Sequence, residues 1–241
     1  MELVILPDAD AVADAGARFF ARALTDEPAL PAVVATGNSP IALYGRLAAL
    51  QAAGAADVRA MTAFQLDTYV GVTDDDPRSL WGWMHRAFVV PLGLSPAQIR
   101  RFDGLAPDPA AECARMDANI AAVGGLGLAV LGLGPNGHLG FNEPPSAPDA
   151  PSRPVALTPE SVRSNARYWG DEDRVPRHAL TMGMAPLLGA RRILLVVTGA
   201  HKHGVLRATV EGPAGPDLPA SLLQGLPQAI VMADRAAWEG A

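Results

Sequence analysis

The sequence predicts an α/β fold in which a single doubly wound, mostly parallel β-sheet carries helices on both faces. Short apolar runs alternate with windows of helical periodicity along the whole chain, which is typical of repeated strand and helix units. Polar, glycine-containing loops follow several of these runs. With 241 residues, 49% of them hydrophobic and 18% charged, the chain is expected to form one domain, residues 1–241, with a sizeable core.

Nine short apolar runs are the predicted strands. In chain order they are Leu3–Leu6, Ala32–Ala35, Met61–Leu66, Ile99–Phe102, Leu128–Leu133, Val155–Leu157, Ala179–Met182, Ile193–Thr198 and Ala229–Met232. The clearest helical windows between them are Pro40–Leu50 and Ala110–Val123. Cys113 lies on the apolar face of the second window, so we expect it to be a core residue rather than a nucleophile.

The composition narrows the classes of partner. A net charge of −6 without a basic run argues against a nucleic acid partner. A single cysteine allows neither an internal disulfide nor a cysteine-based metal site. The longest apolar run, Ile193–Val197, is far shorter than the ~20 residues of a membrane-spanning helix, and the N-terminus lacks a basic signal region. We therefore expect a cytoplasmic protein with no membrane partner, and the sequence neither requires nor excludes a homo-oligomer.

A small polar segment, Thr36-Gly37-Asn38-Ser39-Pro40, follows the second predicted strand and opens a predicted helix. Gly37 permits a tight turn, Asn38 or Ser39 can cap the helix, and Pro40 suits its first position. A helix cap alone explains these residues. The exposed N–H groups at the positive end of a helix also bind anions, so a phosphate site is an equal alternative.

An acidic residue, Asp67, ends the apolar run Met61–Leu66. An aspartate in this position is often only the cap of the next turn. Ligands of open parallel sheets bind outside the carboxyl ends of the strands, and a general base would be placed there.

A glycine-rich segment, Gly132–Pro144, follows another predicted strand. Its glycines fit the spacing of a dinucleotide fingerprint, but the two prolines at 144 and 145 end any helix that such a site requires, so no nicotinamide cofactor is expected. His138 has Asn136 and Glu143 nearby in this segment. A lone histidine is usually structural, whereas a turn here can bring a carboxylate to one ring nitrogen and leave the other for substrate, which favours a functional role.

Two further segments follow. The run Pro144–Pro154 holds five prolines among small residues, and we interpret it as a mobile active-site loop. Lys202 begins the predicted helix Lys202–Val210 and is placed to meet an anionic substrate. The flanking His201 and His203 lack a third ligand at matching spacing, so no metal site is predicted.

Together these motifs resemble the glucosamine-6-phosphate deaminases, in the superfamily of glucosamine-6-phosphate isomerases and 6-phosphogluconolactonases. The resemblance covers nearly the whole chain, and the order and the spacing of the motifs both hold. The matching segments are residues 35–40, 66–71, 79–88, 132–144, 164–168, 175–183, 199–202, 210–212 and 221–224. The resemblance implies a Rossmann-like fold of the deaminase/phosphogluconolactonase type.

The resemblance also implies the substrate, a phosphosugar, and the reaction. Glucosamine 6-phosphate would be isomerised and deaminated to fructose 6-phosphate and ammonia, without a metal or an organic cofactor. The residues implied to hold the phosphate are Thr36, Gly37, Asn38, Ser39, Arg167 and Lys202.

The implied catalytic groups lie in the other two motifs. Asp67 corresponds to the base that moves a proton between C2 and C1 of the sugar. His138 corresponds to the ring-opening histidine, and Asn136 and Glu143 correspond to its partners. A histidine, with a reference pKa of about 6.5, suits proton exchange with a sugar ring, and one carboxylate facing two adjacent carbons suits the proton transfer.

The sequence departs from the family at three points. Asn136 stands where some members have Asp, which leaves more of the stabilisation of a His138 cation to Glu143. Thr68 stands where the family usually has Glu, which affects substrate positioning. Arg153 matches a basic residue of members regulated by N-acetylglucosamine 6-phosphate, but Val155 replaces a lysine, so we expect weak or absent allosteric control.

Three alternatives stay open. A deaminase/isomerase for galactosamine 6-phosphate differs only in how C4 is recognised. A 6-phosphogluconolactonase would have a Ser-Asp-Glu-Arg-like segment near Asp67 and would not continue its Gly-His motif into Asn-Glu-Pro. A sugar-phosphate-binding effector domain would need an attached DNA-binding segment, which does not precede Leu3, and would have no use for Asp67 together with His138.

Overall fold

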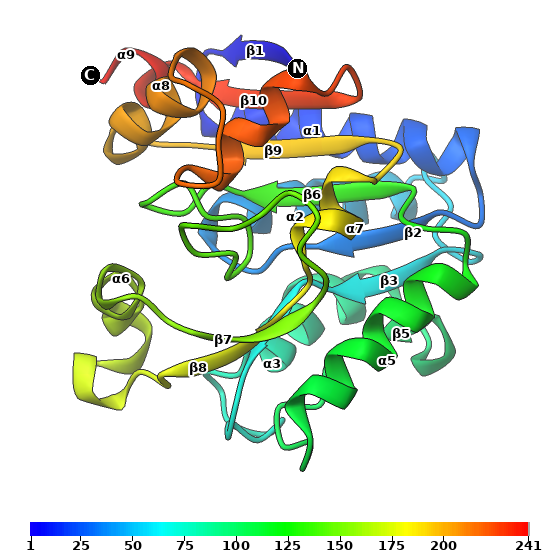
Figure 1. Cartoon of the computed structure of the whole chain (residues 1–241). Helices are drawn as coiled ribbons and strands as arrows, with labels where there is room; N and C mark the ends of the chain where they lie inside the picture. The colour runs from blue at the N-terminus through cyan, green and yellow to red at the C-terminus, as the bar shows by residue number, and fades with distance from the viewer. Residues whose placement is uncertain (241) are drawn as a thin grey trace.

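Seven parallel strands form the central sheet in a computed structural model that describes residues 1–240, apart from the side chain of Asn38 (Figure 1). The strands are β1 (Glu2–Leu6), β2 (Pro31–Val34), β3 (Thr62–Gln65), β5 (Ile99–Arg100), β6 (Leu128–Gly132), β9 (Ile193–Val197) and β10 (Ala229–Asp234). Their order across the sheet is β1-β10-β9-β6-β2-β3-β5. The chain builds outward from β2 in one direction and from β6 in the other, so the strand order reverses between these two strands. Ligands of such sheets bind at this reversal, outside the carboxyl ends of the strands.

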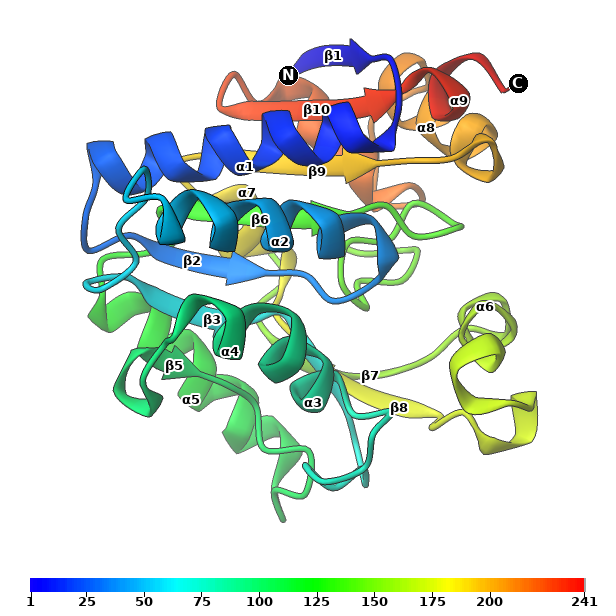
Figure 2. The ribbon, with the colours of Figure 1, turned by 180° about the vertical axis from the view of Figure 1, so that it is seen from behind.

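Helices cover both faces of this sheet, as predicted (Figure 1, Figure 2). One face carries α1 (Ala9–Asp26), α2 (Asn38–Ala52), α3 (Leu80–Met84), a π-helical turn at His85–Val89 and α4 (Val90–Leu92). The other carries α5 (Pro109–Ala122), α7 (Met184–Leu188), α8 (His203–Glu211) and α9 (Arg235–Glu239). None of the helices within residues 1–240 is long and apolar enough to cross a bilayer.

The strands are apolar throughout because both of their faces are buried. Val33 of β2 and Leu131 of β6 belong to the core under α5 and α7, whereas their neighbours Val34 and Val130 belong to the core under α1 and α2. Successive side chains of a strand point to opposite faces, so each central strand contributes to two cores. Cys113 is buried in the first of these cores, as predicted.

A second, three-stranded antiparallel sheet corrects the expectation of a single sheet. Its strands are β4 (Asp67–Tyr69), β8 (His178–Thr181) and β7 (Arg153–Ala156), in the order β4-β8-β7. The predicted strands at 155–157 and 179–182 therefore lie here. The run from Thr62 onward is divided at Leu66, whose carbonyl accepts a hydrogen bond from the Met182 N–H at 2.8 Å, and the chain continues as β4 in the new sheet. No glycine or proline marks this division in the sequence.

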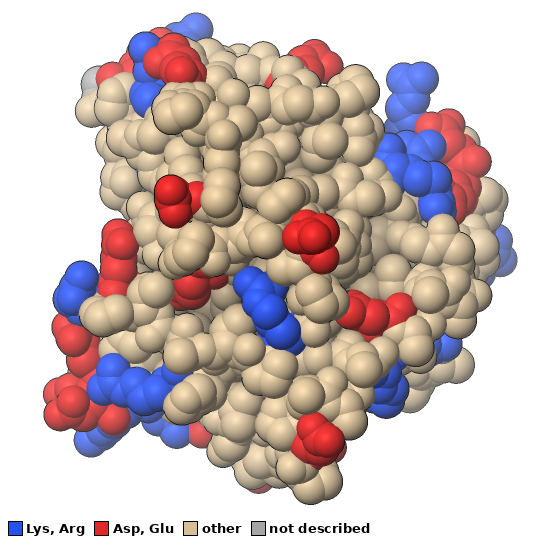
Figure 3. Space-filling view, viewed as in Figure 1, with Lys and Arg blue, Asp and Glu red and all other residues tan. Residues whose placement is uncertain are grey.

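The second sheet leads to α6 (Pro159–Trp169), which stands apart from the seven-stranded sheet on the side where its strands end (Figure 1). A small separate core supports this region, and it includes Tyr69, Phe141, Val162 and Trp169. On the face drawn in Figure 3, acidic and basic side chains are interspersed over a largely uncharged surface. The space between α6 and the strand ends contains the candidate site.

Candidate active site

A cavity of about 440 Å³ lies at the carboxyl ends of β2, β6 and β9 and is closed on its far side by α6. Segments from both sheets line it. They include the loop Thr36–Ser39, Asp67, the turn Gly132–His138, the α6 residues Ser164–Trp169, and Thr198 with His201 and Lys202. The candidate residues that the sequence scattered over 160 positions are thus brought together, with the exceptions of Asn136 and Glu143, which lie behind the cavity wall, and of the Asn38 side chain, which is outside the described part.

The loop after β2 presents an uncapped helix start to the cavity. Gly37 is the residue before the first turn of α2 and has φ 123°, a conformation that favours glycine. The N-cap position is occupied by Gly37, so the predicted capping by Ser39 is wrong, and the prediction for Asn38 falls on a side chain outside the described part. Pro40 lies at the third helical position rather than the first. The Ser39 hydroxyl instead pairs with the Thr198 hydroxyl at 3.2 Å. The N–H groups of the first turn are left for a ligand.

Two cations lie beside this loop. The Lys202 Nζ donates to the Leu133 carbonyl at 2.6 Å, and the side chain is half-buried. Burial and, next, the charge of Arg167 lower the pKa of Lys202, and both cations line the cavity. Such a pair next to free N–H groups suits a dianion.

Asp67 is the first residue of β4, and its side chain is held in the cavity wall with only 5% of the residue exposed. Its Oδ1 is buried without a hydrogen-bond partner. Burial raises the pKa of Asp67 from 3.8 to about 7, and a hydrogen bond from the Thr36 side chain opposes this shift only in part. A carboxylate that titrates near neutral pH with a free oxygen has the properties of a general base.

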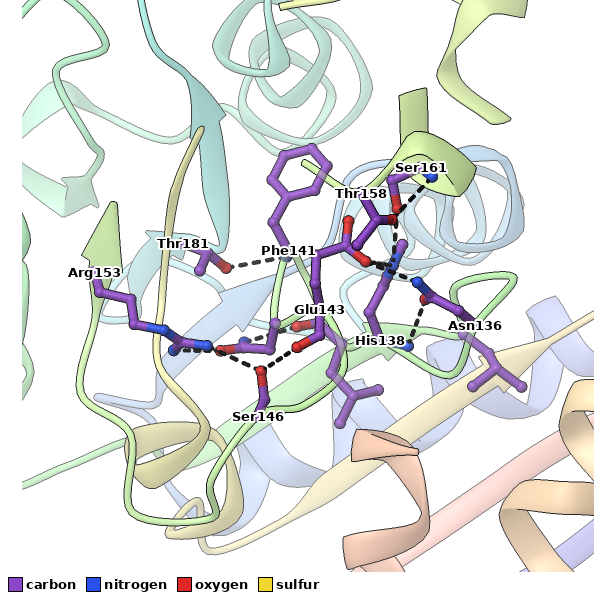
Figure 4. Close-up of polar contacts among 12 residues, drawn as sticks. Asn136, His138, Phe141, Glu143, Ser146, Arg153, Thr158, Ser161 and Thr181 are labelled. Atoms are coloured by element: carbon purple, nitrogen blue, oxygen red, sulfur yellow. Dashed lines mark hydrogen bonds and ion pairs between the residues drawn. The ribbon is translucent and has the colours of Figure 1, made fainter. Parts of the chain in front are cut away.

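His138 lines the same cavity, and its ring is paired with the carboxylate of Glu143 (Figure 4). Its Nδ1 lies 3.2 Å from the Glu143 Oε2 and 3.3 Å from the Ser161 Oγ. Burial alone would raise the pKa of Glu143, but the hydrogen bond and charge of His138 and further hydrogen bonds from Ser161 and Asn136 lower it to about 2. Glu143 is therefore ionised at neutral pH and fixes Nδ1, which leaves Nε2 for a ligand.

Asn136 does not touch the imidazole ring. Its Nδ2 donates to the Glu143 Oε2 at 2.8 Å, and its Oδ1 accepts from the backbone N–H of His138 at 3.3 Å. Asn136 therefore orients Glu143 and the turn, and neither Asn136 nor Glu143 lines the cavity. Gly134, which lies between the end of β6 and Asn136, has to be a glycine, since a Cβ there would come within 2.1 Å of the His138 ring.

The segment behind this turn is anchored at several points, which differs from the expected mobile loop. Arg153, at the start of β7, donates to the Asn142 Oδ1 at 2.8 Å and to the Ser146 Oγ at 2.9 Å (Figure 4). The Ser146 hydroxyl in turn donates to the Glu143 carbonyl at 2.6 Å. Residues 133–152 contain no helix, as the prolines at 144 and 145 predict.

Several cavity residues were missed from the sequence. Ser161 reaches His138 because it lies in the first turn of α6, capped by Thr158, and the Thr-Pro-Glu-Ser pattern of that cap was the available signal. Arg78 and Arg86 also line the cavity, and Arg78 stacks on Trp169 with 4.3 Å from its Cζ to the ring. Thr68, in contrast, is buried and absent from the lining, so its departure from the family pattern does not reach the site.

The neighbouring histidines differ in position. His201 lines the cavity beside Lys202, whereas His203 lies in α8 and its buried Nδ1 has no partner. Within residues 1–240, no three His, Cys, Asp or Glu side chains are placed to hold one metal ion.

Comparison with known proteins places this geometry in a family. The family described as glucosamine-6-phosphate isomerases/6-phosphogluconolactonase matches residues 7–232. The chain is 39% identical over 237 residues to a glucosamine-6-phosphate deaminase of Cutibacterium acnes and 40% identical over 238 residues to that of Streptomyces avermitilis; each match covers 98% of this chain and 91% of the relative.

Solved structures agree. A monomeric glucosamine-6-phosphate deaminase superposes with a TM-score of 0.95 at 32% identity and 98% coverage of both chains. A 6-phosphogluconolactonase from Trypanosoma cruzi shares the fold, with a TM-score of 0.77 at 14% identity over 98% of this chain and 95% of its own. The chain therefore belongs to the family of glucosamine-6-phosphate isomerases and 6-phosphogluconolactonases.

Proposed function

We propose that this protein converts glucosamine 6-phosphate and water to fructose 6-phosphate and ammonia. One observation carries the proposal: a single cavity is lined by an uncapped helix start and two cations, which we call its phosphate end, and by Asp67 with His138, which we call its proton-transfer end. The Thr36 side chain, hydrogen-bonded to Asp67, joins the two. The first end suits a phosphate group and the second suits proton transfer at a sugar carbon. Deaminases of this substrate are the relatives that match over nearly the whole chain.

The phosphate group would bind at the loop Thr36–Ser39, with countercharge from Arg167 and Lys202. Three things support this placement: the free N–H groups at the start of α2, the positive end of that helix, and the two cations that face the same space. A phosphate fixed there directs the sugar toward Asp67.

His138 would open the pyranose ring. Its free Nε2 would take the C1 hydroxyl proton and return a proton to the ring oxygen, while Glu143 stabilises the imidazolium through Nδ1. The product of this step is an open-chain aldehyde, in which the C2 proton is acidic because it lies next to the carbonyl.

Asp67 would then remove the C2 proton and deliver it to C1. The C2–H bond breaks, the C1 oxygen takes a proton from the ammonium group of the substrate to form an enol across C1 and C2, and protonation at C1 gives an iminium group at C2. Addition of water to that carbon expels ammonia and leaves the ketose. A single buried carboxylate suits both transfers because the two carbons are adjacent and its Oδ1 is unpartnered.

Residues 1–241 would act as one domain, since both sheets contribute to the lining of the same cavity. We expect a cytoplasmic location, because a doubly charged sugar phosphate does not cross a bilayer unaided.

The test is an ammonia-release assay on glucosamine 6-phosphate, galactosamine 6-phosphate and unphosphorylated glucosamine, with acid release from 6-phosphogluconolactone measured in parallel. We expect the highest kcat/KM with glucosamine 6-phosphate and almost none without the phosphate. A higher value for the galactosamine epimer would change the substrate. Acid release from the lactone without ammonia from any amino sugar would replace the proposal with a lactonase.

A further inference from the structure

The turn after β9, residues Thr198–Lys202, carries two groups to the phosphate end of the cavity. The Thr198 hydroxyl pairs with the Ser39 hydroxyl, and Lys202 lines the cavity together with Arg167. Gly199 begins this turn with φ 92°, and a Cβ there would lie 2.9 Å from the His201 ring. The backbone of Gly199 is therefore restricted to a conformation that side-chain-bearing residues rarely adopt, and the turn needs a contact that stabilises this conformation.

The group that holds the turn is the carboxylate of Asp234, the last residue of β10. Asp234 is 4% exposed, and both of its oxygens lie 3.0 Å from the Gly199 nitrogen, which donates to them. The Oδ1 also accepts from the Ala237 N–H at 2.7 Å and so caps α9. One buried carboxylate thus joins the ends of two neighbouring strands.

The contact between Asp234 and Gly199 also affects the position of Lys202. The Lys202 N–H donates to the Gly199 carbonyl at 3.0 Å, so the orientation of that peptide sets where the lysine leaves the backbone. The Lys202 Nζ is then within reach of the Leu133 carbonyl at the other wall. A rotated Gly199 would move the ammonium group out of the cavity.

Considered by its charge alone, Asp234 would be unfavourable next to a site that binds an anion. The carboxylate of Asp234 lies at the turn that carries Lys202, and its negative charge opposes the binding of an anion there. A hydrogen bond from a backbone N–H to a carboxylate is, however, stronger than one to a neutral acceptor. The presence of an acid therefore indicates that the geometry of the turn outweighs its unfavourable charge.

We propose that Asp234 is a positioning residue for the phosphate end of the cavity: it fixes the Gly199–Lys202 turn so that Lys202 meets the anionic group of the ligand. This role of Asp234 rests on the proposed function in one respect, namely that the ligand carries the phosphate group of a sugar phosphate. Asp234 acts through Lys202 and does not touch the ligand.

Two substitutions and a control test this role. Asp234→Ala removes all acceptors, whereas Asp234→Asn keeps the oxygen that accepts from both Ala237 and Gly199 but loses the negative charge and the second acceptor for Gly199. Asp8 is the control, because it caps α1 after the neighbouring strand β1 by accepting from the Ala11 N–H at 2.8 Å and is absent from the lining of the cavity. Asp8→Ala removes a helix cap and one negative charge away from the cavity lining.

The measurement is the Kd for inorganic phosphate by calorimetry, together with KM, kcat and Tm. Asp234→Ala should raise the Kd for phosphate and the KM by about tenfold or more, with kcat near the wild-type value, since a lost charged hydrogen bond is of that size. Asp234→Asn should raise both in the same direction by a smaller factor, because it keeps one neutral acceptor for Gly199. Asp8→Ala should lower Tm with Kd and KM unchanged. Phosphate binding requires no turnover, so this outcome is independent of whether the enzyme releases ammonia.

A double substitution tests the route through Lys202. In the Lys202→Ala background, Asp234→Asn should have little further effect on the Kd for phosphate, because the residue that it positions is gone. Additive effects would overturn the proposal, as would Asp234 variants that lose stability like Asp8→Ala while binding phosphate normally. Asp234→Asn, which retains the cap, keeps the test valid if Asp234→Ala fails to fold.

Discussion

The two ends of the cavity are built on different principles. The phosphate end lies where strands of the parallel sheet finish, and it uses backbone N–H groups, left-handed glycines and partly exposed cations. The other end lies where the second sheet begins, and it uses the buried side chain of Asp67 and the His138–Glu143 pair. The pKa of the Asp67 carboxyl is raised, whereas that of the Glu143 carboxyl is lowered. The first is suited to hold a charge and the second to move a proton. Substitutions at the two ends should therefore separate KM from kcat.

The largest effect is expected at Asp67. Asp67→Asn preserves the shape of the side chain but cannot accept the C2 proton, so kcat should fall by about 10² to 10⁴ while the Ki of a competitive phosphosugar analogue stays within a few-fold. The measurement is ammonia release with inhibitor titration. Turnover within about tenfold of wild type would remove Asp67 from the reaction.

The same variant has a second readout. Because the folded pKa, about 7, exceeds the unfolded value of 3.8, the stability contributed by neutral Asp67 is complete below pH 3.8 and is lost as the pH rises to about 7. Asp67→Asn should therefore raise Tm at pH 8, and the gain should shrink toward pH 4. If the Tm of Asp67→Asn at pH 8 is equal to or lower than that of the wild type, burial of the ionised Asp67 carboxylate does not destabilise the protein.

The next largest effect is expected at His138, whose proposed task is confined to ring opening. His138→Gln should slow turnover of the cyclic amino sugar phosphate much more than the reverse reaction from a ketose phosphate enriched in its open-chain form. Both rates and a melting curve are measured on one preparation. Equal losses in the two directions with a lower Tm would make His138 a structural residue of the glycine-rich turn.

Lys202→Ala tests the opposite end. Loss of a charged contact to the phosphate should raise KM by about tenfold to a hundredfold and change kcat little. Steady-state kinetics are compared with those of Arg191→Ala, whose guanidinium pairs with Glu27 on the surface and serves as a control for the loss of one positive charge. If KM is the same in wild type and Lys202→Ala, the lysine does not hold the phosphate.

The smallest effect is the pH dependence near neutrality. Asp67 acts as a base only when ionised, so kcat should be level above pH 7 and fall as the pH drops through about 7. Lys202→Ala should show the same midpoint, since the lysine does not transfer the proton. A kcat that is constant from pH 5 to pH 8 would contradict both the displaced pKa and the role of Asp67.

The two ends also differ in how far the sequence could predict them. Thr36–Ser39 and Lys202 each follow an apolar strand directly, and parallel strands bring their carboxyl ends to one edge, so their convergence could be predicted from local patterns. The uncapped start of α2 could not be predicted in this way, because the presence of Ser39 in the sequence does not show whether its hydroxyl contacts the helix backbone or Thr198.

The proton-transfer end depends on contacts between distant segments. Asp67 was identified as the end of a strand, but its burial comes from the pairing of β4 with β8, with Asp67 opposite Thr181. Ser161 and the contact from Asn136 to Glu143 depend on where α6 and the glycine-rich turn pack. No periodicity or spacing within one segment encodes such placements.

The inward orientation of Arg153 has a regulatory consequence. Its guanidinium is committed to Asn142 and Ser146, and Ser146 supports the Glu143 carbonyl. An anionic effector that bound this arginine would first have to withdraw it from the turn that carries Glu143. By thermodynamic linkage, such a ligand would bind best to a state with a loosened histidine partner, so it would act as an inhibitor rather than as an activator.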